Sequence, residues 1–349
     1  MNKIAIVTGS CGLVGSESCI FLLKKKFKVI GIDNNFRKKF FGKDGDTLWM
    51  KNKLSNIKNY NHYTLDIRNK KKIEQIFQFY KNKIKLIIHS AAQPSHDWAK
   101  KNEILDYEIN SSATISLLNL TKKYCSSAVF IYTSTNKVYG DNPNKIKLLE
   151  KKTRFHPTLK KFRKGISESM SIDDCTHSFF GASKLSADII AQEFGRNYSL
   201  KTGIFRAGCI TGENHSGAKL HGFLSYLVKK CIKKNKYNII GYKGKQVRDN
   251  IHSEDLINSF WEFYNKPRKG EIYNIGGSIY SNCSILEAIK YIEKKIKKKI
   301  AITYTKKNRI GDHIWYVSDI SKFKKHYPNW KLNYSFEKIM NKLIQNYTS

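Results

Sequence analysis

Short apolar runs alternate with longer amphipathic segments over the first 208 residues of the chain. The runs are rich in β-branched residues, as is typical of buried strands, whereas the segments between them repeat their apolar residues at helical spacing. The pattern predicts strands at residues 3–9, 28–33, 85–92, 128–135 and 202–208, and helices at 15–26, 72–82, 105–124 and 181–198. Buried strands separated by amphipathic helices predict an α/β fold, a doubly wound parallel sheet with helices on both faces.

The alternation weakens after about residue 212, where strands become fewer. We predict that residues 1–212 form mainly the sheet domain and residues 213–349 mainly a smaller lobe, with about 238–262 returning to the sheet. The chain has only 5 prolines and neither a low-complexity linker nor an internal repeat. The lobe is therefore expected to be interleaved with the sheet domain rather than appended to it.

Length and composition narrow the class of protein. A chain of 349 residues with 40% hydrophobic residues is long enough for a sizeable core. No apolar run reaches the ~18 residues that a membrane span requires, and the apolar start runs directly into a glycine turn, so no signal peptide is expected. The 7 cysteines are odd in number and contain no CxxC pair. This pattern predicts a reducing cytoplasm and no structural metal site.

The formal net charge of +36 has two interpretations. Clustered lysines would indicate a nucleic-acid or anionic-lipid binder. Lysine runs instead recur along the whole chain, at 23–28, 69–72 and 294–299 for example, which favours a lysine-rich surface without such a partner. The excess charge is still expected to attract negatively charged metabolites by long-range steering.

The segment "VTGSCGLVGS" carries the strongest local signal. Gly9, Gly12 and Gly15 follow a predicted strand and open a predicted helix. Glycines there permit a tight turn, so that a pyrophosphate can lie at the helix N-terminus. Asp33 ends the next strand, where a carboxylate accepts hydrogen bonds from ribose hydroxyls and repels a 2′-phosphate. The pattern predicts a Rossmann dinucleotide site that prefers NAD, although the nearby Arg37 leaves NADP open.

Two further segments are expected at the carboxyl ends of the strands, where ligands bind in such sheets. "TLDIRN" places Asp66 and Ile67 in position for an adenine contact. "HSAAQPSHDWA" places Ala91 and Ala92 where the chain passes the cofactor, although their small size equally suits helix–sheet packing. The neighbouring histidine and aspartate of this loop suit acid–base chemistry, although a loop histidine in solvent is the more common outcome.

The strand "FIYTST" ends in the hydroxyl cluster Thr133, Ser134 and Thr135, and "FFGASK" follows with Lys184. Together these segments resemble the extended short-chain dehydrogenase/reductase family, in which a Ser or Thr and a Tyr-x-x-x-Lys pair face the nicotinamide. The resemblance includes "RDNIHSEDL", "YNIGG" and "RIGDHIWYVSD", which look like substrate-side segments. "TSTNKVYG", "HSFFGASK" and "GYKGKQVRDNIH" are most similar to the branch of CDP-paratose 2-epimerases, also called CDP-tyvelose epimerases.

The resemblance implies a bound NAD that is reduced and reoxidised in each turnover. Hydride leaves C2 of a CDP-linked 3,6-dideoxyhexose, the 2-keto sugar turns over in the site, and hydride returns to the opposite face. The expected partners are this nucleotide sugar and other copies of the chain, as a homodimer or homotetramer through helices 105–124 and 183–198. Neither a membrane nor a nucleic acid is an expected partner, and RNA binding stays as the alternative that the charge of +36 suggests.

The resemblance also implies roles for individual residues. Its cofactor contacts fall on Gly9, Gly12, Leu13, Val14, Gly15, Asp33, Asn34, Asp66, Ile67, Ala91, Ala92, Gln93, Asn110 and Lys184. Its substrate contacts fall on Asn136, Asn214, His221, Arg248, Arg309 and Asp312. Arg248 suits a diphosphate because its planar fork binds in a bidentate manner. Lys243 and Lys245 are expected in a solvated loop, and Arg206 in an internal ion pair.

One position departs from the family, because Phe180 stands where the tyrosine of the Tyr-x-x-x-Lys pair is expected. Thr135 and Lys184 retain their places, but a phenyl ring cannot accept a proton. The candidates for the base are His177, His96 and Asp97. Alternatively the chain carries out a different reaction of the same fold, as a dehydratase, 4-epimerase or decarboxylase, or it binds without catalysis. Against a 4,6-dehydratase, Asn136 and Lys137 stand where that branch has an Asp-Glu pair.

Overall fold

The computed structural model describes residues 3–217, 222–233, 236–306, 308 and 311–348. The chain forms two compact units, each assembled from separate stretches of sequence. The first unit consists of Met1–Thr135, Phe179–Arg206 and Ile257–Tyr273, and the second of Asn136–Ser178, Ala207–Leu256 and Asn274–Ser349. It stays a prediction that residues 1–212 bind mainly the cofactor and residues 213–349 mainly the substrate.

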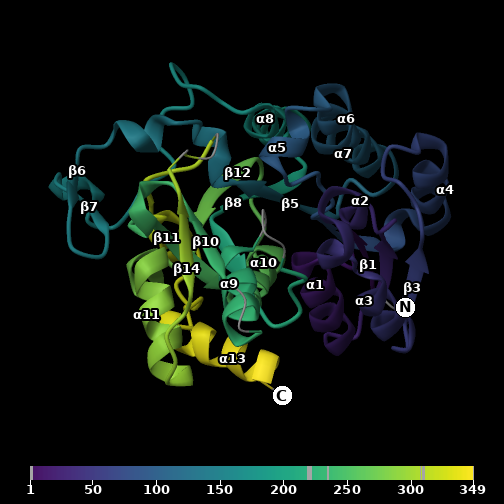
Figure 1. The fold of residues 1–349 in the computed structure, drawn as a ribbon. Coiled ribbons are helices and arrows are strands. Elements are labelled where there is room, and N and C mark those ends of the chain that lie inside the picture. The colour runs from purple at the N-terminus through teal and green to yellow at the C-terminus, as the bar shows by residue number, and fades with distance from the viewer. Residues whose placement is uncertain (1–2, 218–221, 234–235, 307, 309–310, 349) are drawn as a thin grey trace. The chain divides into compact units, whose positions relative to one another are not determined.

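A seven-stranded sheet with the order β12-β8-β5-β4-β1-β2-β3 forms the centre of the first unit (Figure 1). The neighbours β1–β2, β2–β3, β1–β4 and β4–β5 run parallel. The strands are β1 Ile4–Thr8, β2 Lys28–Ile32, β3 Tyr60–Tyr63, β4 Ile84–His89, β5 Val129–Thr135, β8 Lys201–Ala207 and β12 Glu271–Ile275. Each strand predicted from the hydrophobic pattern is present, which confirms the parallel α/β sheet.

The predicted helices are also confirmed. They are α1 Leu13–Lys24, α4 Lys70–Tyr80, α7 Ala113–Tyr124 and α8 Phe179–Tyr198. The predicted helix 105–124 begins as α6 Glu103–Tyr107 and reaches α7 through a π-helical turn, Glu108–Ser112. The sequence pattern did not predict α2 Arg37–Phe41, α3 Leu48–Ser55 or α5 His96–Ala99. Helix α10 Ser253–Asn265 directly precedes β12 in the chain.

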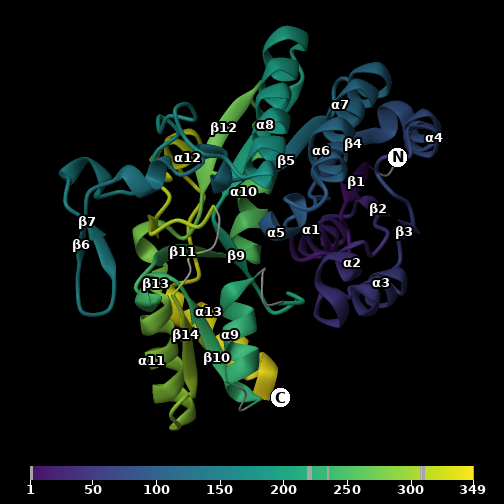
Figure 2. The same cartoon turned by 45° about the horizontal axis from the view of Figure 1, so that its top comes forward.

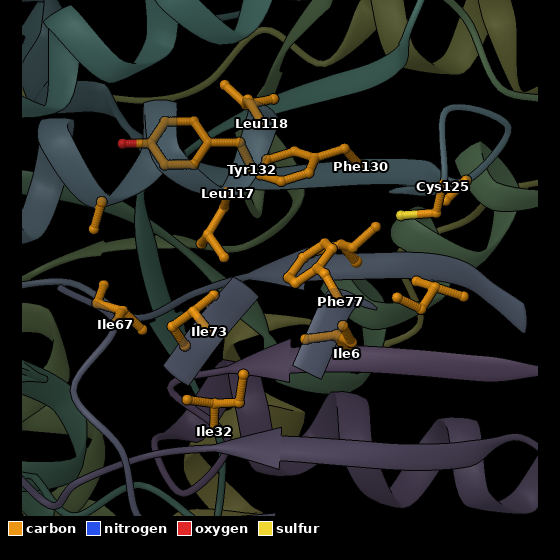
Figure 3. Close-up of a cluster of buried hydrophobic side chains, with 14 of the residues drawn as sticks. Ile6, Ile32, Ile67, Ile73, Phe77, Leu117, Leu118, Cys125, Phe130 and Tyr132 are labelled. Atoms are coloured by element: carbon orange, nitrogen blue, oxygen red, sulfur yellow. The ribbon is translucent and has the colours of Figure 1, made fainter. Parts of the chain in front are cut away.

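Apolar side chains at alternate positions of the strands cover one face of the sheet (Figure 3). Ile6 of β1, Ile32 of β2 and Phe130 of β5 belong to one buried cluster with Phe77 of α4 and Leu117 of α7. This face is therefore covered by α4 and α7, and α8 adds buried alanines to the same cluster. Burying each large aliphatic or aromatic side chain contributes about 1.5–3 kcal/mol, so the cluster dominates the stability of this layer.

Helices α1 and α10 cover the opposite face. The ring of Phe205 on β8 contacts that of Phe260 on α10, with 4.8 Å between centroids. Phe21 of α1 contacts Trp261 of α10, with 5.6 Å between centroids. With helices on both faces, the predicted doubly wound sheet is confirmed.

The second unit contains smaller sheets and its own core. A four-stranded sheet joins β9, β11, β13 and β15, a parallel pair joins β10 and β14, and β6 and β7 form an antiparallel hairpin (Figure 2). Its strands are β6 Leu148–Glu150, β7 Phe155–Pro157, β9 Cys209–Thr211, β10 Tyr237–Ile240, β11 Val247–His252, β13 Asn282–Ser284, β14 Ile302–Thr305 and β15 Trp315–Tyr316. Its helices are α9 Phe223–Ile232, α11 Ile285–Ile296, α12 Ser321–His326 and α13 Phe336–Thr348. Apolar residues of α9, α11, α13 and β10 form the core.

The segment that returns to the large sheet differs from the predicted range 238–262. β11, which lies in that range, pairs within the four-stranded sheet, whereas β12 at Glu271–Ile275 joins the large sheet beside β8. The physical reason lies in the side chains. β11 reads "VRDNIH" and buries polar groups, while β12 places Tyr273 and Ile275 in an apolar layer.

All cysteines are unpaired thiols, and none of the described helices is long and apolar enough to cross a bilayer.

Asp249 of β11 is a buried carboxylate that joins three segments of the second unit. Its Oδ2 accepts backbone N–H bonds from Ser278 at 3.1 Å and Ser318 at 3.0 Å. A Cβ on Gly276 would lie 2.0 Å from this oxygen, so the glycine leaves the space that the carboxylate occupies. Burial raises the pKa of Asp249 to about 6, although the two N–H groups oppose the shift.

We expect Asp249→Asn to change the pH dependence of stability. A pKa raised from about 3.9 in the unfolded chain means that the folded state binds the proton more tightly, so Asp249 contributes stability below about pH 4 that is lost as the pH rises through about 6. The melting temperature of Asp249→Asn, followed by circular dichroism, should therefore improve relative to wild type between pH 4 and pH 7, by the equivalent of about 3 kcal/mol. The exposed Asp173→Asn is the control, and a difference that stays constant with pH contradicts the prediction.

Candidate active site

The glycine turn between β1 and α1 has the geometry of an anion-binding loop. Gly9 has a φ of +68°, and a Cβ there would lie 2.8 Å from the backbone nitrogen of Ala91. A Cβ on Gly15 would lie 2.0 Å from the carbonyl oxygen of Gly9, so packing explains both glycines. A Cβ on Gly12 would approach only that oxygen, at 3.4 Å, and no side chain caps the first turn of α1. The open N–H groups of the turn, at Leu13 among others, fit a pyrophosphate.

The carboxylate of Asp33 holds the end of β2 against this turn. Its Oδ2 accepts the N–H of Cys11 at 3.0 Å, and its Oδ1 accepts the N–H of Asn35 at 2.7 Å. Burial raises the pKa of Asp33, while these two N–H groups act in the opposite direction. Burial lowers the pKa of Arg37 to about 10, and Asp33 opposes that shift, which places the guanidinium within electrostatic range of the carboxylate. A carboxylate with a cation nearby suits the expected contact with ribose hydroxyls, and that contact stays a prediction.

A small cap that the sequence pattern did not predict follows Asp33. The Nδ2 of Asn35 donates to Asp46 at 2.8 Å, which ties the chain before α2 to the residues just before α3. The rings of Phe36 and Phe40 lie 5.0 Å apart, and Phe40 contacts Trp98 of α5 at 4.8 Å. Helical periodicity is weak in "FRKKFFGKDGD", and the only signals are the turn residues and the three phenylalanines. The contact between Phe40 and Trp98 therefore holds α5 against this cap.

A buried polar network fixes the segment between β4 and α5. The N–H of Gln93 donates to Asn110 Oδ1 at 2.9 Å, and its Nε2 donates to Asp106 Oδ1 at 2.6 Å and to the carbonyl of Ser95 at 2.9 Å. Ser183 on α8 donates to Asp106 Oδ2 at 2.5 Å. Asn110 lies in the π-helical turn, a feature often found at functional sites, and its Nδ2 is also 3.1 Å from Ser183 Oγ. The network joins this segment to the helix that carries the candidate lysine.

Two small residues of the same segment pack against the glycine turn. Ser90 Oγ donates to the carbonyl of Thr8 at 2.7 Å, and the N–H of Ala91 is 3.3 Å from Thr8 Oγ1. The backbone of Ala91 closely approaches Gly9, and its side chain packs against the buried apolar cluster of the sheet. Cofactor contacts of Ala91 and Ala92 stay predictions.

Lys184 is buried at the end of β5. Its Nζ donates to the carbonyl of Thr133 at 2.8 Å and lies 4.2 Å from the centroid of the Tyr132 ring. Burial lowers the pKa of Lys184 to about 7, while the charges of Asp188 and Asp106 act in the opposite direction. The structure therefore brings Lys184 to the strand that ends with the predicted hydroxyl residue Thr135.

Arg206 forms an internal ion pair, as predicted. Its Nη2 and Nε donate to the two oxygens of Asp188 at 2.8 and 3.0 Å, and both side chains are buried. Ser134 of β5 donates to Asp188 Oδ2 at 2.5 Å, and Gln192 donates to Asp188 Oδ1 at 2.8 Å. Ser134 is thus bound to the interior of the sheet, which separates its role from that of its neighbour Thr135.

Phe180 lies one turn before Lys184 on α8 and is 7% exposed. The ring of His96 on α5 packs edge-to-face against it, with 4.9 Å between centroids and 69° between planes. His96 is half-buried, whereas the neighbouring Asp97 is exposed. Of the candidate bases, His96 is thus placed directly against the ring that replaces the expected tyrosine.

His177 belongs to the second unit and has a different environment. Its Nε2 lies 2.9 Å from the carbonyl of Ile172 and 3.3 Å from Cys175 Sγ. Because a carbonyl only accepts, Nε2 carries the proton. Nδ1 is buried, 3.2 Å from where a Cβ on Gly140 would lie. The imidazole is therefore occupied in holding the loop that precedes α8.

The predicted substrate residues lie in the second unit. Arg248 of β11 forms an ion pair with Asp312, and Lys137 donates to the carbonyl of Gly311 at 2.8 Å, so both cations approach the same segment. Asn136 is buried and Asn214 is half-buried. The predicted contacts His221 and Arg309 lie outside the described residues.

Lys243 and Lys245, which were expected in a solvated loop, both approach Glu150. Lys245 Nζ lies 2.6 Å and Lys243 Nζ 3.6 Å from Glu150 Oε1. The side chain of Lys243 is 77% exposed, but that of Lys245 is only 17% exposed, so the expectation describes Lys243 better than Lys245.

Asp66 is held by ionic contacts. Arg68 donates to both of its oxygens, at 3.1 and 2.9 Å, and Asn34 Nδ2 is 3.4 Å from Oδ2. Arg68 also pairs with Glu108 at 2.8 Å. The backbone at Asp66 is therefore fixed after β3, and adenine contacts of Asp66, Ile67 and Asn34 stay predictions. Among the described residues, no group of three or more His, Cys, Asp or Glu side chains is arranged to hold a metal ion.

Comparisons with known proteins agree with this geometry. The profile of the NAD dependent epimerase/dehydratase family matches residues 5–276. CDP-paratose 2-epimerase of Salmonella typhi is 32% identical over 323 residues, which are 91% of each chain. dTDP-glucose 4,6-dehydratase of Salmonella typhimurium is 26% identical over 98% of this chain and 92% of its own.

Among solved structures, UDP-glucuronic acid 4-epimerase from Bacillus cereus, in complex with UDP-glucuronic acid and NAD, superposes with a TM-score of 0.79 at 24% identity. The superposition covers 99% of each chain, so the fold is shared throughout. The glycine turn, Asp33 and the lysine beside β5 fit the nicotinamide cofactor for which the family is named. The chain belongs to the NAD dependent epimerase/dehydratase family, and its cofactor is NAD.

Proposed function

We propose that this chain is an NAD-dependent nucleotide-sugar epimerase that inverts C2 of a CDP-linked 3,6-dideoxyhexose, as CDP-paratose 2-epimerase. The observation that carries the proposal is the buried Lys184 at the end of β5, beside a strand that ends in Thr135. In this family such a lysine and hydroxyl residue face the nicotinamide, together with a group that accepts the hydroxyl proton of the sugar. The choice of sugar and carbon is supported by the Salmonella typhi relative and by the segments that resemble that branch.

The residues after Thr135 favour epimerisation over dehydration. Dehydratases of this family carry an Asp-Glu pair there, and elimination of water needs such acid–base groups. Here Asn136 is buried and Lys137 donates to the carbonyl of Gly311. Neither side chain supplies a carboxyl group, so the oxidised sugar is expected to be reduced again without losing water.

The residues of the chain divide the work. NAD, when bound, accepts hydride from the sugar carbon and returns it. The open turn at Gly12 binds the pyrophosphate, and Asp33 accepts hydrogen bonds from the ribose hydroxyls. Lys184 holds the nicotinamide ribose and stabilises a developing alkoxide, toward which Thr135 donates a hydrogen bond. Arg248 binds the diphosphate of the substrate with its planar fork.

Surface charge and cysteine chemistry support a cytoplasmic enzyme with an anionic substrate. A net charge of +36 steers nucleotide sugars toward the protein by long-range attraction. All cysteines are free thiols, in keeping with a reducing compartment.

The first prediction from the proposed function concerns the reaction itself. Protein incubated with NAD and CDP-paratose should produce the C2 epimer, followed by NMR of the C2 proton, whereas CDP-glucose in parallel tests the requirement for a dideoxy sugar. Lys184→Met should abolish turnover, because an apolar side chain of similar length removes the charge that stabilises the alkoxide. Protein that binds NAD but leaves both sugars unchanged contradicts the proposal, and conversion of another nucleotide sugar redirects it within the family.

A second prediction concerns the choice of cofactor. Asp33→Asn should weaken NAD binding by about 10–100-fold, because hydrogen bonds to a charged group contribute about 1.5–3 kcal/mol. The same change should reduce the preference for NAD over NADP. It removes the negative charge that repels a 2′-phosphate, while Arg37 remains nearby. Titration calorimetry with both cofactors measures this, with the exposed Asp44→Asn as control. Unchanged selectivity would mean that Asp33 only braces the glycine turn.

We also propose that the chain forms dimers through α7 and α8. Figures 1 and 2 show α6 and α7 beside α8. Large apolar side chains on these helices are exposed: Ile104 by 78%, Tyr107 by 52%, Ile189 by 40% and Ile115 by 36%. An apolar flank on so lysine-rich a chain is expected to be covered by a second copy.

Replacing Ile115 and Ile189 together by lysine should therefore convert the dimer into a monomer, because like charges then face each other across the two-fold axis. Light scattering coupled to size-exclusion chromatography measures the mass. Phe79→Lys, at a 76% exposed position on α4, is the matched control and should leave the dimer intact. A wild-type monomer at micromolar concentration contradicts the proposed assembly.

A further inference from the structure

The proposed reaction needs an acceptor for the hydroxyl proton of the sugar. When the C–H electron pair leaves as hydride, the O–H bond must release its proton so that the carbonyl forms. Phe180 occupies the tyrosine position of α8 and has no ionisable group. Removing a general base typically costs about 10²–10⁴-fold in rate, so a functioning enzyme is expected to hold one elsewhere in reach of Phe180.

His96 is the titratable side chain that the structure places against Phe180. The two rings meet edge-to-face at 4.9 Å between centroids. Phe180 is almost fully buried, whereas His96 is half-buried. The His96 imidazole is therefore accessible to solvent while it also contacts α8, the helix that carries Lys184. Phe180, which His96 contacts, lies one helical turn before Lys184 on α8.

The backbone around His96 is held rigidly. Ser95 caps the N-terminus of α5, since its Oγ accepts the N–H of Trp98 at 3.3 Å. The buried Gln93 binds Asp106, which in turn binds Ser183 on α8. On the other side of α5, Trp98 packs against the aromatic cap that follows Asp33. A catalytic side chain needs such preorganised support.

The competing candidates are placed less well. His177 uses Nε2 as a donor to the carbonyl of Ile172, and its Nδ1 is buried near Gly140. Asp97 is exposed on α5. Neither side chain combines partial burial with contact to the ring that replaces the phenol.

We infer that His96 is the catalytic base of this chain, standing in for the tyrosine that Phe180 replaces. An imidazole nitrogen takes the proton of the sugar hydroxyl as the C–H electron pair leaves to NAD as hydride and the carbonyl forms. The imidazolium returns that proton to the oxygen when hydride returns to the carbon, so each turnover leaves protein and cofactor unchanged. This inference rests on the proposed function and deepens it.

The test compares His96→Ala with the double variant His96→Ala/Phe180→Tyr in the full-length enzyme. Single-turnover absorbance of reduced nicotinamide reports the oxidation step, and calorimetry reports NAD affinity. His96→Ala should lower the oxidation rate by about 10²–10⁴-fold with NAD affinity unchanged. Restoring the phenol beside Lys184 in the double variant should recover much of the rate. His156→Ala, at an exposed histidine of β7, is the matched control.

Two readouts separate a catalytic role from a structural one. Free imidazole in the buffer should partly rescue His96→Ala, because a soluble base can enter the space that the side chain vacates. The wild-type rate should fall as the pH drops below the pKa of the base, about 6.5 for an ordinary imidazole, and this acidic limb should be absent from His96→Ala.

Each outcome is decisive. A His96→Ala variant that keeps the wild-type rate and acidic limb overturns the inference, and so does a loss that neither imidazole nor Phe180→Tyr restores. If Asp97→Ala or His177→Ala loses the oxidation rate while His96→Ala keeps it, then Asp97 or His177, respectively, is the base and the inference is wrong. A wild-type protein that binds NAD but reduces none of it with any nucleotide sugar refutes the proposed function, and with it the role of His96.

Discussion

The buried ion pair between Asp188 and Arg206 is the interaction on which the catalytic edge of the sheet depends. It joins α8 to β8, and through the Ser134 hydroxyl it also holds the end of β5. Removing one member of a buried pair leaves an uncompensated charge and typically costs about 3–5 kcal/mol. Asp188 lies one turn after Lys184 on α8, so the pair fixes the helix register that brings the lysine ammonium to the Thr133 carbonyl. Thr135 and Lys184 owe their positions to this support.

The sequence predicted the parts of this site that are local. Glycine spacing and the position of Asp33 follow from a single strand–turn–helix unit, whose geometry a short motif specifies. Lys184 was located by the resemblance of "FFGASK" to the Tyr-x-x-x-Lys motif, and Arg206 was expected in an internal ion pair. The base was left open among three residues because the choice depends on which side chain packs against Phe180, a contact between residues far apart in sequence.

Contacts between distant segments explain the other omissions. The network of Gln93, Asp106 and Ser183 links three elements that only the folded chain brings together. The segment that returns to the large sheet was expected near 238–262, but buried polar groups direct β11 to a different sheet. Hydrophobic pattern predicts that a strand exists, whereas its partner strand depends on buried hydrogen bonds such as those of Asp249.

A histidine base changes what the lysine has to do. A phenol has a pKa near 10 and needs a neighbouring ammonium to lower it toward neutrality. An imidazole already titrates near neutral pH, and a fully charged lysine close by would lower its pKa and make it a weaker base. Burial lowers the pKa of Lys184 to about 7, against the influence of Asp106 and Asp188, so Lys184 opposes protonation of a nearby imidazole less than an ordinary lysine would. Such a lysine can still lower the pKa of a phenol placed at position 180, and it is equally compatible with a histidine base. The buried lysine and Phe180 therefore form one coherent arrangement rather than a site that has merely lost its tyrosine.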